Sequence, residues 1–175
     1  MNLLRTYATA QARNNRWANA TLLGACKRLT DTSFCENRGG FFGSIAGTAN
    51  HILMVDHYYI DALVEGGRGR DVYADYTEFD RADLLADAQA ESDERLIAFC
   101  EGLSEADFSR LVVTDRGEKG APQETIRALL PHLFQHQVHH RGQIHGLLSQ
   151  THVAPPQLDD FFLEFERAAD ARFES

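Results

Sequence analysis

Five of the eight histidines of this chain lie between positions 132 and 145, with no cysteine among them. Two of these, His136 and His140, are four residues apart, so on a helix they lie on the same face about one turn apart. Neutral imidazole is the most common protein ligand for metal ions near neutral pH. The spacing therefore predicts two ligands of a metal site, whose third ligand has to come from another part of the fold.

The phase of the expected helix indicates which histidines face inward. One inward heptad position is shared by Ile126, Leu133, His140 and Leu147, and the other by Leu129, His136 and Gln143. His136 and His140 therefore interrupt an apolar stripe, whereas His132 and His139 fall on its flank and His145 lies further out. Two buried imidazoles are costly unless their nitrogens are bonded, and a shared metal ion would satisfy one nitrogen on each ring. Pairing His136 with His139 is an alternative at a spacing of three residues.

The third ligand is expected to be His51, which lies inside an apolar stretch of another expected helix. His57 lies six residues further on, points well away from His51, and is expected at the surface or an edge. One histidine from one helix and two from another leave a coordination position for water or substrate, as in reactive rather than closed structural sites. The competing interpretation is that these are ordinary core histidines with hydrogen-bond partners.

Four amphipathic segments must position these residues, and together they predict an all-α four-helix bundle in a single domain, 1–175. The expected helices cover 2–29, Gly43-Ser44 to about residue 65, about 81–102 and about 123–150. Within 107–122 we expect a short extended segment with a turn at 115–120. The apolar and acidic tail, 158–173, is expected to pack as a last short helical segment.

Composition excludes several classes of function. The net charge of −9 and the absence of a basic run argue against nucleic acid as a partner. The three cysteines are odd in number and form no CxxC pair, which favours reduced thiols in a cytoplasmic protein. The first residues lack the pattern of a signal peptide, and no apolar run is long enough to span a membrane, so no membrane association is expected.

Three segments of the chain resemble motifs of the DinB family. These are Asn15–Asn19 (N-R-W-A-N), the stretch from Phe42 to Asp56, and the His136–Gln143 stretch (H-Q-V-H-H-R-G-Q). They occur in the same order as in the family, and the likeness extends over nearly the whole chain.

This resemblance implies an up-down-down-up bundle, usually homodimeric, in which three histidines hold a divalent metal ion. Carried over by motif, the ligands are His51, His136 and His140. Two features depart from the family pattern. Gln135 stands where many relatives have asparagine, and Pro131 is expected to kink or restart the last helix about one turn before His136.

The wider superfamily includes transferases and isomerases that use low-molecular-weight thiols. The first hypothesis is therefore a metal-dependent enzyme that transfers a thiol or performs a hydrolase-like reaction on a small molecule, with Zn, Ni, Cu or Fe as the ion. No general base is evident, and Asp56, Gln143 and Asn15 are candidates to support the ligands. The second hypothesis is a metal-binding stress or damage-inducible protein without catalysis, in which the ion only stabilises the bundle.

Overall fold

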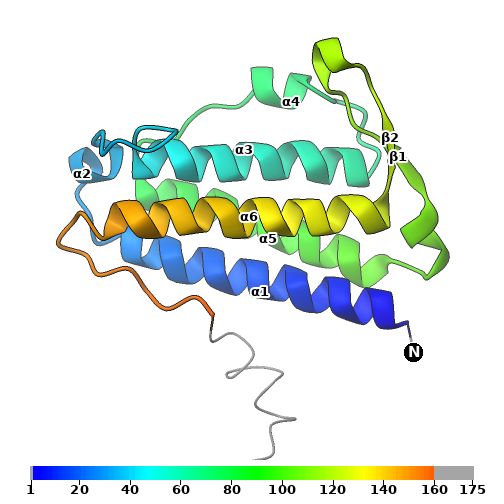
Figure 1. Cartoon of the computed structure of the whole chain (residues 1–175), viewed down its shortest axis with the longest axis horizontal. Coiled ribbons are helices and arrows are strands. Elements are labelled where there is room, and N and C mark those ends of the chain that lie inside the picture. The colour runs from blue at the N-terminus through cyan, green and yellow to red at the C-terminus, as the bar shows by residue number, and fades with distance from the viewer. Residues whose placement is uncertain (1, 160–175) are drawn as a thin grey trace, which may run out of the picture.

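The computed structural model describes residues 2–159, and four long helices dominate it (Figure 1). They are α1 (Leu3–Cys26), α3 (Ile45–Leu63), α5 (Ala82–Gly102) and α6 (Ile126–Leu148). α1 packs along α5 and α3 along α6, while α3 also contacts α5 and α1 contacts α6. In Figure 1, α1 and α6 run in one direction and α3 and α5 in the other. The predicted all-α class is confirmed, and each long helix ends within three residues of its expected bounds.

Local sequence explains where the helix that carries His51 begins. The Ser44 hydroxyl accepts a hydrogen bond from the Gly47 amide at 2.9 Å and caps the first turn of α3. Gly43 precedes it with a φ of +76°, a conformation that residues with a Cβ rarely adopt. The chain therefore turns sharply between Phe42 and α3, and this turn brings the Phe42 ring back over the helix.

The apolar core consists of two clusters separated by a polar layer. The first cluster lies toward the C-terminal end of α3 and includes Tyr58, Leu63, Leu96, Leu129 and Leu133. The second lies toward the opposite end of the bundle and includes Leu22, Phe34, Ile45, Leu53 and Ile144. Seven buried polar side chains lie between the two clusters: Asn15, Asn19, Asp56, Gln89, Asp93, Gln137 and Arg141. We call this set the polar layer.

Short elements between the helices were only partly expected. The expected extended segment is β1 (Leu111–Val113), which pairs antiparallel with β2 (Gln123–Thr125), so that Leu111 faces Thr125. Because β2 occupies the residues where the last helix was expected to begin, α6 starts only at Ile126. Two helical turns were not anticipated, α2 (Asp31–Cys35) and α4 (Asp71–Ala74), and 3-10 turns occur at Ala106–Ser109 and Gly117–Lys119.

Of the kink or restart expected at Pro131, the restart is wrong. α6 is continuous from Ile126 to Leu148, with Pro131 inside it. A proline at this position removes one backbone hydrogen bond, to the carbonyl of Arg127. Both residues are exposed, so water can satisfy that carbonyl. Most of the expected C-terminal helical segment, 158–173, lies outside the described residues.

None of the helices within residues 2–159 combines the length and the hydropathy needed to cross a bilayer.

Candidate metal centre

The structure brings His51 of α3 together with His136 and His140 of α6. The Nε2 atoms of His51 and His136 lie 3.0 Å apart. One ring nitrogen from each of the three residues lies within 4.8 Å of the others. The ring centroids of His136 and His140 are 4.3 Å apart, and those of His51 and His140 are 4.6 Å apart. Among the described residues, these three histidines are the group whose side chains could hold a metal ion.

The separation of the rings is compatible with a shared metal ion and with a hydrogen bond between two neutral imidazoles. Nitrogen ligands about 2.1 Å from a common ion lie about 3.0 Å apart at right angles and about 3.4 Å apart at the tetrahedral angle. The 3.0 Å between the Nε2 atoms of His51 and His136 is close to this range. The Nδ1 atom of His136 is buried without a hydrogen-bond partner among the described atoms. The three residues therefore fit a divalent ion.

Gln143 orients one of the three rings. Its Oε1 atom lies 2.8 Å from Nδ1 of His140 and can only accept, so that nitrogen carries the hydrogen. The Nε2 atom of His140 is then the basic nitrogen available for the cluster. The amide nitrogen of Gln143 lies 3.2 Å from Nε2 of His139, and His139 itself is exposed. This contact agrees with the expectation that Gln143 supports one of the ligands.

Burial keeps the three rings in the neutral form that binds metal. Burial, together with the neighbouring histidines, lowers the pKa of His51 to about 4 and that of His136 to about 3. Burial also lowers the pKa of His140, although the bond to Gln143 opposes this shift. Near pH 7 all three imidazoles are therefore neutral bases, and a metal ion does not have to displace protons from them.

Phe42 forms an aromatic wall beside the triad. Its ring stacks on His51, with centroids 4.1 Å apart and an interplanar angle of 24°. It meets His140 nearly edge-on at 5.5 Å. Phe41, the preceding residue, is 87% exposed and packs edge-on against Phe42. His51 and His136 are only half-buried, so the triad is partly exposed beside this aromatic ring.

The acidic half of the polar layer is built around Asp93 and Asp56. Asp93 accepts hydrogen bonds from the side-chain amides of Asn15 and Asn19, each at 3.0 Å. The amide of Gln89 donates to Asp56 at 2.8 Å and to Asp93 at 3.3 Å. Burial raises the pKa of both carboxyl groups to about 7, against the opposing effect of these hydrogen bonds.

The other half of the polar layer comes from α6. Arg141 donates to the side-chain oxygens of Asn15, Asn19 and Gln137, and Gln137 in turn donates to Asp56. Burial lowers the pKa of Arg141 to about 10, while Asp93 and Asp56 oppose that shift. Gln137 and Arg141 each follow a triad histidine by one residue, about 100° around the helix. Their bonds fix the rotation of α6 about its axis, which keeps the histidines facing α3.

Several sequence expectations need correction. Asn15 and Asp56 do not contact the triad, because their side chains are used within the polar layer. The centre of the buried face of α6 passes through Gln137 and Arg141, so His136 lies at its edge and is only half-buried. The heptad assignment was thus shifted by about one position.

Of the other histidines, His132 is exposed and contacts Tyr59. His57 is half-buried beside the ring of Tyr76. The polar layer itself was missed. The signal that could have found it is the pairing of polar residues four apart, Asn15 with Asn19 and Gln89 with Asp93, on faces that are otherwise apolar.

Comparison with known proteins places this helical bundle and its motifs in a family. The DinB family model matches residues 5–171, so the chain belongs to the DinB family. The chain is similar to Protein DinB of Bacillus subtilis (strain 168), with 24% identity over 151 residues that span 83% of this chain and 86% of that protein.

Two solved structures have the same fold. A DinB-like protein from Bacillus cereus ATCC 10987 matches with a TM-score of 0.65 at 19% identity, over 83% of this chain and 91% of that one. The DinB-like protein YjoA from Bacillus subtilis matches with a TM-score of 0.64 at 20% identity, over 87% of this chain and 97% of that one. The resemblance drawn from the three motifs is confirmed at the level of the family.

Proposed function

We propose that this DinB-family protein is a metal-dependent enzyme in which His51, His136 and His140 hold a divalent cation. The observation that carries the proposal is the convergence of three neutral imidazoles from two helices, with two Nε2 atoms 3.0 Å apart. Three imidazoles suit Zn, Ni or Fe, and availability decides between them more than affinity does. The partial exposure of His51 and His136 leaves room for a small substrate.

Such an ion, when bound by three uncharged ligands, keeps its full charge and supplies a Lewis acid that lowers the pKa of a thiol or of water. The chain's own residues prepare the site. Gln143 holds His140 in one tautomer, and Phe42 excludes water from one side of His51. The polar layer holds α6 in register through Gln137 and Arg141.

Thiol transfer is favoured over hydrolysis because no general base is evident at the metal centre. Among the described residues, the cluster consists of histidines alone, with no carboxylate in it. A thiol with an ordinary pKa of about 8.5 needs far less help to ionise than water, whose pKa is about 15.7. A coordinated thiol is deprotonated outright, whereas a water bound to such an ion has a pKa of about 7, so a thiol is the more completely ionised nucleophile at neutral pH. We infer a low-molecular-weight thiol and a small electrophile as substrates.

The test is turnover of metal-loaded protein with simple thiols and electrophiles, measured as loss of free thiol. The wild type is expected to consume thiol faster than the background reaction, and His51→Ala is expected to reduce the rate to background. His139→Ala, which changes an exposed histidine in the same segment, is expected to retain the rate. No turnover across a broad panel, in protein shown to hold the metal, would refute the enzymatic proposal.

A non-catalytic metal-binding role is the second candidate. The convergence of one nitrogen from each of three imidazoles supports this role as well, because a bound cation would hold α3 and α6 together. In that case a chelator should lower the melting temperature. The same protein should show no turnover, and this distinguishes the two candidates.

A further inference from the structure

The two strands of the β1–β2 hairpin present different edges to their surroundings. β1 has the sequence Leu-Val-Val, whereas β2 has the sequence Gln-Glu-Thr and directly follows Pro122. Charged side chains and proline discourage other chains from pairing with the edge of a sheet. β2 has both of these features close to its edge, and β1 has neither. β1 is therefore the edge of this hairpin at which a further strand can pair.

The ladder between the two strands determines which backbone groups of β1 face outward. The amide of Thr114 donates to the carbonyl of Pro122 at 3.0 Å, and the amide of Ile126 donates to the carbonyl of Arg110 at 3.1 Å. Bonded and non-bonded pairs alternate along an antiparallel ladder, so Val112 bonds to β2 while the N–H and C=O groups of its two neighbours point away from it. Among the described residues, no turn or loop bond reaches these four groups. We call them the outward groups of β1.

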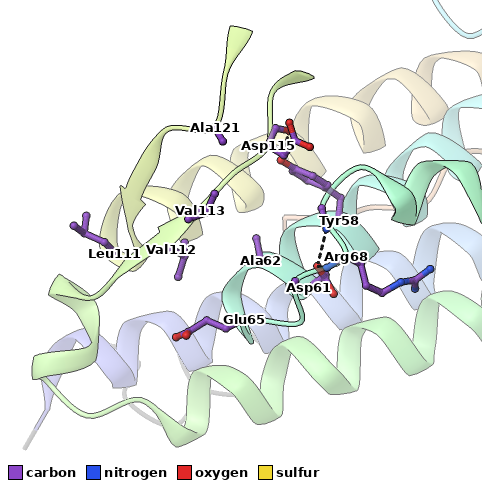
Figure 2. A pocket seen from close by; sticks show the side chains of 12 residues that line it. Tyr58, Asp61, Ala62, Glu65, Arg68, Leu111, Val112, Val113, Asp115 and Ala121 are labelled. Carbon is purple, nitrogen blue, oxygen red and sulfur yellow. Dashed lines mark hydrogen bonds between the residues drawn. The ribbon is translucent and has the colours of Figure 1, made fainter. Parts of the chain in front are cut away.

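A pocket of about 470 Å³ lies along this edge, between β1 and the end of α3 (Figure 2). All three residues of β1 line it, and no residue of β2 does. Figure 2 shows Ala62 and Glu65 on the opposite side, where α3 ends. The side chains of Leu111 and Val113 are 53% and 54% exposed. The pocket, which we call the edge pocket, therefore lies where an additional extended segment would pair with β1.

The charge of the edge pocket indicates which kind of segment fits. Its charged lining residues are Asp61, Glu65, Asp115 and Arg68. The side chain of Arg68 extends away from β1 in Figure 2, and Glu65 is ion-paired with Arg110. Asp61 and Asp115 accept hydrogen bonds from backbone amides, and neither forms an ion pair within the described part of the chain. Two carboxylates without a cation thus line the pocket, in a protein with a net charge of −9. This favours a partner that carries a basic side chain.

We propose that the free edge of β1 is a docking site for an extended segment of another protein, in which apolar residues alternate with a basic residue. The segment adds a third strand to the hairpin by bonding to the outward groups of Leu111 and Val113. Alternate side chains of a strand lie on opposite faces, so one set covers these two exposed side chains while the other enters the edge pocket. A second copy of this chain fits less well, because its own β1 brings a second set of acidic groups against the first.

The test uses a fluorescein-labelled peptide, Val-Thr-Val-Arg-Val, and the same peptide with Glu in place of Arg. Their dissociation constants are measured by fluorescence anisotropy with wild type, Leu111→Pro and Thr125→Pro. Leu111→Pro removes an outward N–H of β1, and the preceding Arg110 has a ψ of 136°, which a following proline tolerates. Thr125→Pro is the matched control, because it removes an outward N–H of β2 at a φ of −74° that suits proline.

The wild type is expected to bind the Arg peptide roughly tenfold more tightly than the Glu peptide, because attraction is replaced by repulsion. Leu111→Pro should weaken binding of the Arg peptide by roughly tenfold through the loss of one backbone hydrogen bond, whereas Thr125→Pro should retain it. No binding of either peptide by the wild type up to about 1 mM would refute the proposal. Equal affinities of the two proline variants for the Arg peptide would also refute it.

N-methylated peptides make the test independent of how well the variants fold. Two versions of the Arg peptide carry N-methyl groups on alternate residues, in opposite phase, and both are measured with wild type. Only every second N–H of an added strand bonds to β1, so one version should lose binding and the other should keep it. Equal behaviour of the two versions would overturn the proposal. Self-association of the wild type that Leu111→Pro abolishes, without peptide binding, would assign the edge to a second copy and overturn it as well.

Discussion

Replacement of Arg141 by methionine tests whether the polar layer holds the triad in place. Arg141 is 6% exposed and donates to the side-chain oxygens of Asn15, Asn19 and Gln137. Methionine keeps most of the length but none of the donors, so three buried acceptors lose their partner. Removal of one partner from a buried charged network costs about 3–5 kcal/mol. We expect Arg141→Met to lower the free energy of unfolding by about this amount at pH 8.

The loss of unfolding free energy caused by Arg141→Met should depend on pH, because Arg141 lies near two carboxyl groups. The folded-state pKa of Asp56 and Asp93 is raised from 3.8 to about 7, so these groups destabilise the fold when charged. This destabilisation is fully present above about pH 7 and diminishes as the pH falls toward 4. Without the positive charge of Arg141, the charged forms of Asp56 and Asp93 destabilise the fold further. The loss caused by Arg141→Met should therefore be smaller at pH 6 than at pH 8, by at least about 1 kcal/mol.

The assay is urea unfolding of chelator-treated protein at both pH values, with Arg127→Met as an exposed control on α6. The depressed histidine pKa values act equally in wild type and variant, so they cancel in the difference. A second readout is metal affinity of the folded variant, which should fall although Arg141 contacts none of the triad. A loss below about 1 kcal/mol at pH 8, or an identical loss at both pH values, would refute the role assigned to the polar layer.

Three further predictions follow from the site. Gln143→Ala should weaken metal binding by about 10- to 100-fold, as loss of ligand-orienting bonds usually does, in competition with a chromophoric chelator; an unchanged affinity would show that the bond to His140 is incidental. Between pH 7 and about pH 5 metal binding should release at most one proton, because the pKa values of His51 and His136 are lowered to about 4 and 3 and, of the three ligands, only His140 can protonate in this range; a slope of two protons in a pH-resolved titration would contradict this. Phe42→Ala should leave metal stoichiometry unchanged but weaken binding of apolar thiols, and equal affinity in calorimetry would remove Phe42 from the site.

Periodicity predicted the helices and the convergence of the three histidines, because both depend on which residues share a helix face. His51 and His140 interrupt faces that are largely apolar, and His136 lies one turn before His140 at the edge of the same face; both features are visible in the sequence alone. The polar layer was not predicted, since Gln89 or Asp93 read singly is an ordinary surface residue of α5. Only the packing of α1, α5 and α6 shows that these side chains meet.

Features that depend on loops could not be predicted in the same way. The position of Phe42 over His51 depends on the positive φ of Gly43, and many other loop conformations fit the same residues. The contact of Arg116 with Tyr59 joins the hairpin loop to α3 across 57 positions. Likewise, α6 begins at Ile126 because the preceding residues pair with β1, which is a non-local effect.

The most direct test of the account is elemental analysis of purified wild type beside His51→Ala, His136→Ala and His140→Ala, with His139→Ala as the control. We expect about one divalent ion per chain in the wild type and in His139→Ala, and a strong loss of metal in His51→Ala, His136→Ala and His140→Ala. Equal metal content in all five proteins, or loss only in His139→Ala, would contradict the proposed centre.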